Sequence, residues 1–227
     1  MSLFSLLLRG RSRRWLGLAL LFASPVLMAA TTPSASVESP GKILRVTLQV
    51  DGGTARYQVQ RLGDAVVDAS KLGFELRDGR LDRDFEITGS STRAFDETWE
   101  QPWGERRLTR NHYNELTVSL RQTTGDKRRL DVVFRVFDDG VGFRYVFPQQ
   151  PGLAEAIIDE ELTEFAIAQP STAWWIPAGE PIHYEYLYAR TPLQEVPLAH
   201  TPITLRSESG LHVAIHEAAL VDYAGMW

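Results

Sequence analysis

Two neighbouring segments in the middle of the chain alternate between large apolar side chains and polar or small ones. The alternation runs through Leu130–Val136 and returns in Val141–Phe147. Because successive side chains of a strand point to opposite faces, a period of two predicts β-structure. The two segments are joined by Asp138-Asp139-Gly140, and an Asp-Gly pair between alternating runs favours a β-hairpin. The apolar face of such a hairpin needs a second sheet to cover it.

Weaker alternation predicts further strands on both sides of this hairpin. Ile43–Val50 and Thr54–Gln60 flank the turn signal Asp51-Gly52-Gly53 and predict a second hairpin. The remaining predicted strands are Leu72–Arg77, Asn114–Arg121, Thr163–Ala168, Ala173–Ile176, Pro202–Arg206 and Leu211–Glu217. There is no internal repeat and no heptad pattern. The pattern predicts an all-β fold, a large antiparallel sandwich.

The first thirty residues predict a signal peptide. Four arginines between Arg9 and Arg14 precede an apolar run from Trp15 to Met28, and the small residues Ala29 and Ala30 follow. The run is shorter than the roughly 20 residues that span a bilayer core. We therefore expect an exported protein, periplasmic or secreted, with no membrane attachment once the leader is cleaved. An uncleaved membrane anchor is the alternative. Residues 31–41, rich in Thr, Ser, Pro and Ala, are expected to form a flexible lead-in to a domain over residues 42–227.

Removal of the leader leaves an acidic protein. The 24 basic residues become 20 against 29 acidic ones, a net charge of about −9. A negative surface argues against nucleic acids and anionic membranes as partners. The chain has no cysteine, so export brings no disulfide framework. Phosphate-binding and nucleophile motifs such as G-x-x-x-x-G-K-S/T, G-x-G-x-x-G and G-x-S-x-G are also absent.

Two adjacent segments carry candidate sugar-binding chemistry. Phe95–Glu105, expected to be a loop, contains Trp99, Trp103 and Glu105. Indole faces stack on sugar C–H surfaces, and carboxylates bind hydroxyl groups or hard cations. The alternative is that the tryptophans cap the sandwich and the acids are solvated. Arg110–Glu115, expected just before a strand, is dense in hydrogen-bonding groups and is expected to brace the first segment through Arg–carboxylate pairs.

The C-terminal strand candidate ends in an acid. Leu211, Val213 and Ile215 share one face of the predicted strand, and Glu217 continues that face. A carboxylate at the rim of an apolar core is costly unless it is paired or bound to a metal. A solvated strand end is the alternative. His212 and His216 do not make a zinc motif, because no third ligand has suitable spacing.

A series of short motifs runs in order along the chain. The motifs are Asp96–Glu100, Trp103–Glu105, Arg110–Leu116, Phe134–Val136, Asp138–Gly140, Phe143–Tyr145, Glu161–Phe165, Thr172–Pro177, Tyr184–Tyr188, His216–Leu220 and Asp222–Met226. Together, over about residues 39–227, they resemble the N-terminal domain of glycoside hydrolase family 97.

The resemblance implies a function for one residue and a partner domain. Members of that family are exported α-glucosidases and α-galactosidases that act on α-linked oligosaccharides. Their N-terminal domain is a β-super-sandwich, galactose-mutarotase-like, which packs on a catalytic (β/α)₈ barrel. A calcium ion in the active site is held mainly by barrel glutamates. The motif matching His216-Glu217-Ala218 supplies one further ligand, so Glu217 is the expected metal ligand.

The chain departs from that pattern at its end. It stops at Trp227, before the barrel that supplies the general acid and the base or nucleophile. We therefore assign no catalytic residue to it and expect no hydrolysis by the chain alone. The alternative function is a stand-alone periplasmic sugar-binding or structural super-sandwich without catalysis.

Overall fold

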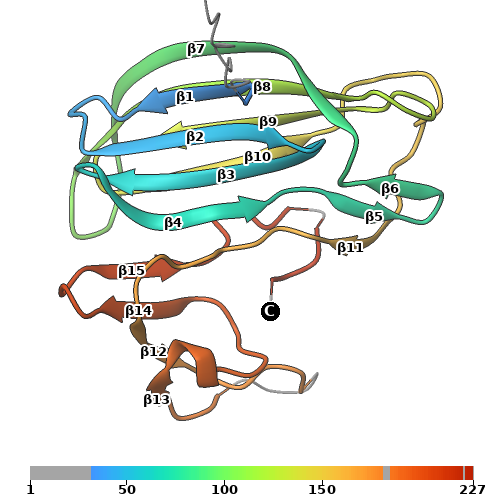
Figure 1. The fold of residues 1–227 in the computed structure, drawn as a ribbon. Coiled ribbons are helices and arrows are strands. Elements are labelled where there is room, and N and C mark those ends of the chain that lie inside the picture. The colour runs from blue at the N-terminus through green and yellow to red at the C-terminus, as the bar shows by residue number, and fades with distance from the viewer. Residues whose placement is uncertain (1–31, 181–184, 222, 227) are drawn as a thin grey trace, which may run out of the picture. The chain divides into compact units, whose positions relative to one another are not determined.

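The computed structural model describes residues 32–180, 185–221 and 223–226, and the predicted signal peptide over residues 1–30 lies outside them (Figure 1). Apart from one short 3₁₀ helix, η1 (Leu193–Glu195), the regular elements are strands. They are β1 (Ser34–Glu38), β2 (Leu44–Asp51), β3 (Thr54–Arg61), β4 (Asp64–Lys71), β5 (Phe74–Leu76), β6 (Gly79–Leu81), β7 (Phe85–Glu100), β8 (Leu108–Gln122), β9 (Arg129–Val136), β10 (Val141–Val146), β11 (Ile158–Glu161), β12 (Ser171–Trp175), β13 (Ala189–Pro192), β14 (Ile203–Ser207) and β15 (His212–Ile215). No helix in the described ranges has the length and apolar character to cross a membrane.

The described strands form four antiparallel sheets. The first has the order β1-β2-β3-β4, and the second has the order β10-β9-β8-β7. A small sheet, β11-β5-β6, and a C-terminal sheet, β13-β12-β14-β15, complete the fold. Both hairpins predicted from turn signals are confirmed, since β2 pairs with β3 and β9 pairs with β10. The all-β antiparallel class is confirmed with them.

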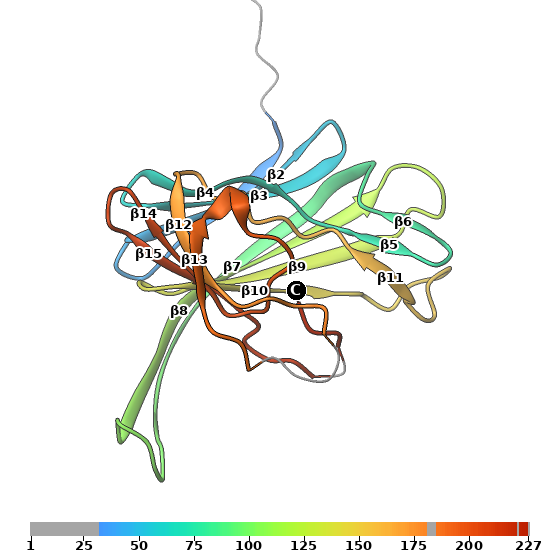
Figure 2. The ribbon, with the colours of Figure 1, turned by 90° about the horizontal axis from the view of Figure 1, so that it is seen from below.

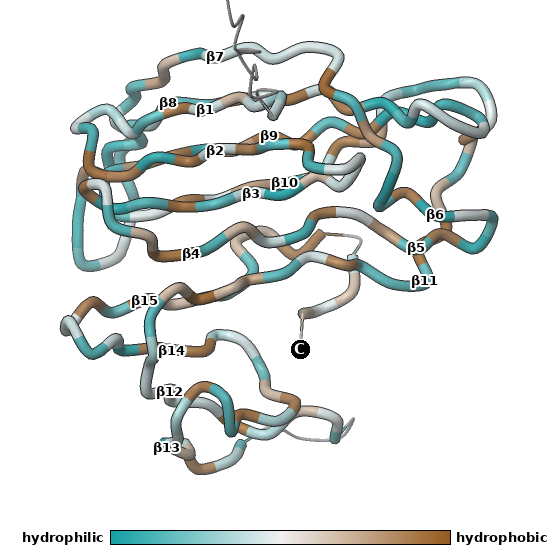
Figure 3. The backbone as a smooth tube through the Cα atoms, in the orientation of Figure 1, coloured by the Kyte–Doolittle hydropathy of each residue, from teal (hydrophilic) through white to brown (hydrophobic). Residues whose placement is uncertain are grey.

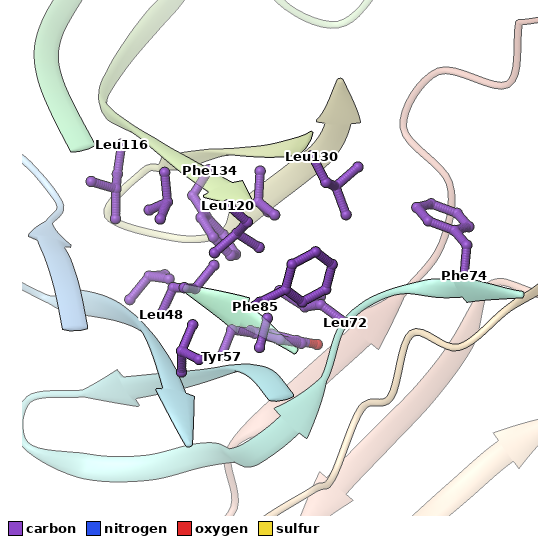
Figure 4. Close-up of a cluster of buried hydrophobic side chains, with 14 of the residues drawn as sticks. Leu48, Tyr57, Leu72, Phe74, Phe85, Leu116, Leu120, Leu130 and Phe134 are labelled. Carbon is purple, nitrogen blue, oxygen red and sulfur yellow. The ribbon is translucent and has the colours of Figure 1, made fainter. Parts of the chain in front are cut away.

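The core lies between the first two sheets. Alternate residues of β2 and β9 are buried, as the period of two requires. Figure 4 shows Leu116, Leu120 and Phe134 of the second sheet pointing toward Leu48 and Tyr57 of the first. The Tyr57 and Phe134 rings lie 6.0 Å apart, within the range of a favourable aromatic pair. Hydrophobic residues recur along the strands of both sheets in Figure 3, and their burial is the main stabilisation of the sandwich.

Two predictions near the edges of the first sheet are wrong. Ser34–Glu38 is not flexible lead-in but strand β1, which pairs with β2 so that Val37 lies opposite Val46. Thr163–Ala168 is not a regular strand, although it runs along β4 and forms an isolated bridge through Ile167. Its ladder is interrupted because the Ser70 hydroxyl takes the Ala166 N–H, at 2.9 Å, in place of a backbone carbonyl.

A third prediction fails at the long hairpin of β7 and β8. Phe95–Glu100 belongs to β7, so the loop narrows to residues 101–107, and Arg110–Glu115 lies inside β8. β9 pairs with β8 only as far as Asn114, opposite Val136. Beyond that point residues 96–112, here called the β7–β8 arm, pair with each other alone and reach past the other strands (Figure 2). Both faces of the arm meet solvent, so no alternation of hydrophobicity marks its strands.

Candidate functional site

Glu217 lies two residues beyond β15, at the edge of the core of the C-terminal sheet. Val213 and Ile215 in that strand pack against buried Trp175 and Leu205. The apolar stripe predicted from the sequence is therefore present, but the strand ends before the acid. The Glu217 side chain is half-buried.

Two neutral donors hold the Glu217 carboxylate. The Thr201 hydroxyl donates to Oε2 at 2.6 Å, and the backbone N–H of Met226 donates to Oε1. The Thr201 hydrogen bond is the largest influence on the pKa of Glu217 and lowers it; burial opposes this, and the Met226 N–H adds to it. The carboxylate is therefore ionised at neutral pH. Among the residues described, no Lys or Arg forms an ion pair with it.

The segment that follows Glu217 is fastened at a second point. The Tyr223 hydroxyl donates to Glu161 Oε2 at 2.6 Å, and the Thr163 hydroxyl donates to Glu161 Oε1 at 2.5 Å. Thr163 also shares a 2.6 Å hydrogen bond with the hydroxyl of Tyr145 in β10. Burial and the Glu161 carboxylate raise the pKa of Tyr223, so its phenol remains protonated and able to donate. These contacts tie the C-terminal segment to the sandwich.

The chemistry of Glu217 fits one position in a calcium site. An ionised carboxylate without a Lys or Arg partner is the hard oxygen ligand that calcium prefers, and each of its oxygens keeps a lone pair beyond the hydrogen bond it accepts. His216 Nδ1 lies 2.8 Å from the Glu217 carbonyl oxygen and is engaged in that hydrogen bond, so this nitrogen is not available as a metal ligand. Within the described ranges no group of three or more His, Asp and Glu side chains is arranged to hold a metal ion. Calcium takes 6–8 oxygens, so Glu217 fits as one ligand among several supplied from elsewhere.

The predicted sugar-contacting residues lie on the β7–β8 arm. Trp99 is 47% exposed in β7, while Trp103 is 83% exposed, and Glu105 is exposed beside it in the loop at the tip. The tryptophans therefore do not cap the sandwich. No hydrogen bond or ion pair in the described structure joins these three residues to Glu217.

Arginine–carboxylate pairs brace the arm, as predicted from the sequence. Arg110 on β8 forms a bidentate pair with Asp96 on β7, with both N···O distances at 2.7 Å. Nearer the tip, Arg107 Nε donates to Glu100 at 2.8 Å. The predicted pairing is present because the acidic segment on β7 faces the Arg110 segment on β8 across the hairpin.

At the base of the arm lies a carboxylate that the sequence did not single out. Glu115 is buried, 6% exposed, on the face of the second sheet opposite the core residue Leu116. Arg93 and Arg135 lie directly across from it on β7 and β9, and both donate to its oxygens. A buried acid on the outer face of a strand has no signal in hydrophobic periodicity.

Comparison with known proteins agrees with this architecture. Residues 37–227 match the family model described as Glycosyl-hydrolase 97 N-terminal. A probable retaining alpha-galactosidase of Streptomyces bingchenggensis is 29% identical over 96% of this chain and 38% of its own length. A retaining alpha-galactosidase of Bacteroides thetaiotaomicron is 23% identical over 85% of this chain and 30% of its own length.

The fold matches a solved enzyme as well. A glycoside hydrolase family 97 enzyme from Pseudoalteromonas sp. strain K8, solved in complex with panose, superposes with a TM-score of 0.81 and 40% identity. The match covers 85% of this chain and 30% of that one, so the chain spans about a third of the length of the relatives it matches. The matched model covers most of the chain, and the chain belongs to the family of glycosyl-hydrolase 97 N-terminal domains.

Proposed function

We propose that this domain serves an exported, calcium-dependent α-glycosidase, in which it packs on a catalytic (β/α)₈ barrel and supplies Glu217 as one calcium ligand. The observation that carries the proposal is the state of Glu217. Its carboxylate is half-buried, held ionised by Thr201 and Met226, and without a Lys or Arg partner among the residues described. A buried negative charge is costly unless something positive compensates it.

Calcium bound there would polarise a substrate oxygen or support the general acid of the reaction. The residues of this chain would set the position of one ligand. Thr201 and the Met226 N–H each hold one oxygen of Glu217, so the carboxylate plane is fixed before a metal arrives. The Tyr223–Glu161 hydrogen bond keeps the segment that carries Met226 in place.

The proposed substrate is an α-linked oligosaccharide. The two curated relatives are described as alpha-galactosidases, and the solved neighbour binds panose. On this domain Trp99, Trp103 and Glu105 are the proposed sugar contacts. Their exposure on a braced arm leaves indole faces and a carboxylate free to meet a sugar or to line its pocket. The predicted leader supports export as the setting for this reaction.

Calcium titration of the complete enzyme tests the proposal. The protein produced from the whole reading frame that contains this chain should bind calcium and hydrolyse an aryl α-glucoside or α-galactoside. Glu217→Gln should lower the calcium affinity at least about tenfold, because it replaces a charged ligand by a neutral amide. The hydrolysis rate should fall with it and recover in part at high calcium concentration.

The matched control is Glu155→Gln, which removes an exposed acid outside the strands and should change neither quantity. An unchanged calcium affinity together with unchanged hydrolysis in Glu217→Gln would remove Glu217 from the site. If the complete protein binds no calcium at all, the proposed calcium site is refuted, whereas membership of the family is unaffected.

A further inference from the structure

The open face of the C-terminal sheet contains a pocket separate from Glu217. Along β12, Ala173 and Trp175 face the core, so Thr172 and Trp174 face outward. Together with residues of β13, η1 and β14 they line a pocket of about 380 Å³. The residues that matter for its chemistry are Trp174, Arg190, Gln194, Arg206 and Glu208.

Strand register assembles this pocket from three neighbouring strands. Trp174 lies directly across from Arg190 on β13, and Thr172 lies directly across from Arg206 on β14. The Arg190 guanidinium stacks over the Trp174 indole, with Cζ 5.4 Å from the ring centroid. Stacking fixes the plane of a guanidinium and leaves the N–H groups at its edge free to donate. Arg190 is therefore oriented in advance for a planar or multivalent acceptor.

The charge of the pocket is not compensated. Neither Arg190 nor Arg206 forms an ion pair with any residue in the described part of the chain, and Glu208 on the rim is not paired with either. Arg93, Arg110 and most other arginines of the described strands are paired with acids. In a chain of net charge −5, two unpaired arginines in one pocket create a local attraction for an anion.

The other lining groups point to a sugar as the carrier of that anion. Gln194 and Glu208 offer donors and acceptors together, which hydroxyl groups require because each hydroxyl both donates and accepts. Trp174 adds an apolar wall of the kind that sugar C–H surfaces pack against. The pocket volume falls within the range of small-ligand sites.

We propose that this pocket binds an acidic sugar, a pyranose that carries a carboxylate or a sulfate ester, with the anionic group on Arg190 and Arg206. The choice of a sugar rests on the proposed function of the domain, whereas the choice of an anion rests on the two arginines. The pocket contains neither Glu217 nor the arm residues, so it is a second binding site, distinct from the proposed calcium site.

Binding to the full chain tests the site, with calorimetry as the measurement. The probes are galacturonate, galactose 6-sulfate, galactose, acetate and inorganic sulfate at one ionic strength. We expect one of the acidic sugars to bind at least about tenfold more tightly than galactose and more tightly than acetate or sulfate. Which acidic sugar binds better identifies the anionic group.

Arg206→Gln should weaken acidic-sugar binding about tenfold to a hundredfold, the usual cost of a lost charge-assisted hydrogen bond. Arg206→Lys should restore part of the affinity, because it keeps the positive charge but lacks the paired N–H donors of a guanidinium. Arg61→Gln is the matched control, an exposed arginine of β3 without an ion pair in the described structure, and should leave binding unchanged. Trp174→Leu should remove the preference for galacturonate over acetate, and thermal unfolding checks that each variant is folded.

Equal affinity for galactose and galacturonate would show that the pocket does not recognise the anionic group. Equal affinity for acetate and galacturonate would show that it does not recognise the sugar ring. No measurable binding of either acidic sugar, or equal loss in Arg61→Gln, would overturn the site. Glu217→Gln should leave this binding unchanged, so failure here and failure of the calcium proposal are separate results.

Discussion

Glu115 offers the sharpest test of how the base of the β7–β8 arm is held. Glu115→Gln keeps the size of the side chain and removes its charge. In the wild-type protein Arg93 donates to both oxygens, at 2.6 and 3.0 Å, and Arg135 Nε donates to Oε2 at 2.9 Å. In the variant an NH₂ group replaces one carboxylate oxygen, so an N–H donor faces a guanidinium that can only donate.

The exposures of the three side chains set the size of the effect. The Glu115 side chain is only 8% exposed, while those of Arg93 and Arg135 are 59% and 41% exposed. Removal of one partner from a fully buried pair costs about 3–5 kcal/mol. Here the guanidinium groups regain water when the acid is lost, so we expect a loss of about 2 kcal/mol in the free energy of unfolding. Glu86→Gln is the control, since its pair with Arg121 joins the same two strands at the surface and should cost less than about 1 kcal/mol.

The pH dependence adds a second signature. The hydrogen bond from Arg93 is the largest influence on the pKa of Glu115 and lowers it, with a further contribution from Arg135. A carboxyl group with a lowered pKa in the folded state stabilises the protein above its unfolded pKa, about 4.3. That stabilisation is lost as the pH falls through the folded-state pKa, because Glu115 then becomes neutral like Gln. The difference between wild type and Glu115→Gln should therefore be constant near pH 7 and shrink below pH 4.

Urea unfolding at several pH values measures both effects. A stabilising role of the Glu115 charge would be refuted if Glu115→Gln is as stable as wild type at pH 7, or if Glu86→Gln lowers the free energy of unfolding as much as Glu115→Gln does. A stability difference as large at pH 3 as at pH 7 would also refute it, because charge would then not be the cause.

Two further predictions concern the proposed binding residues. Thr201→Val removes the donor to Glu217 Oε2, so the pKa of Glu217 should rise and the calcium affinity of the complete enzyme should fall, by roughly 10- to 100-fold; calorimetry that finds unchanged affinity would show that Thr201 does not position the ligand. Trp103→Ala should change the free energy of unfolding by less than about 0.5 kcal/mol, because its indole is 83% exposed, yet weaken oligosaccharide binding; a large loss of stability, or unchanged sugar affinity, would contradict its assignment.

The sequence predicted the sandwich wherever one face of a strand is buried and the other is not. The β9–β10 hairpin follows from its alternation and its Asp-Gly turn, and the structure pairs Val136 with Val141 as that turn requires. β4 went unrecognised because its ladder with β3 is irregular, so its buried residues Val67 and Ser70 do not keep a period of two. The outer half of β7 has no buried face, so its sequence shows no alternation of apolar and polar residues that would predict a strand.

The candidate site shows a different limit. Glu217 was identified by resemblance, since alternation alone favoured a solvated strand end. The groups that fix its charge state come from elsewhere: Thr201 lies 16 residues earlier, and the Tyr223–Glu161 hydrogen bond spans 62 positions. Such contacts depend on how β14 and β15 pair and on where the C-terminal segment turns back. The local hydrophobic periodicity of the sequence predicts neither the pairing of β14 with β15 nor the path of the C-terminal segment.

The charged residues of this domain differ in whether they have partners of opposite charge within it. Arg110 and Glu115 are satisfied within the domain by acids and arginines across the strands, so their charges serve its stability. Among the described residues Glu217 has no Lys or Arg partner and is half-buried, while Arg206 has no acidic partner and lines a pocket with its side chain exposed. A half-buried charge without an ion-pair partner, as at Glu217, costs free energy that a ligand or another domain can return, whereas an exposed unpaired charge, as at Arg206, attracts ions of opposite sign. The uncompensated charges, rather than the most numerous ones, are therefore where this domain is expected to bind: a cation at Glu217 and an anion at Arg206.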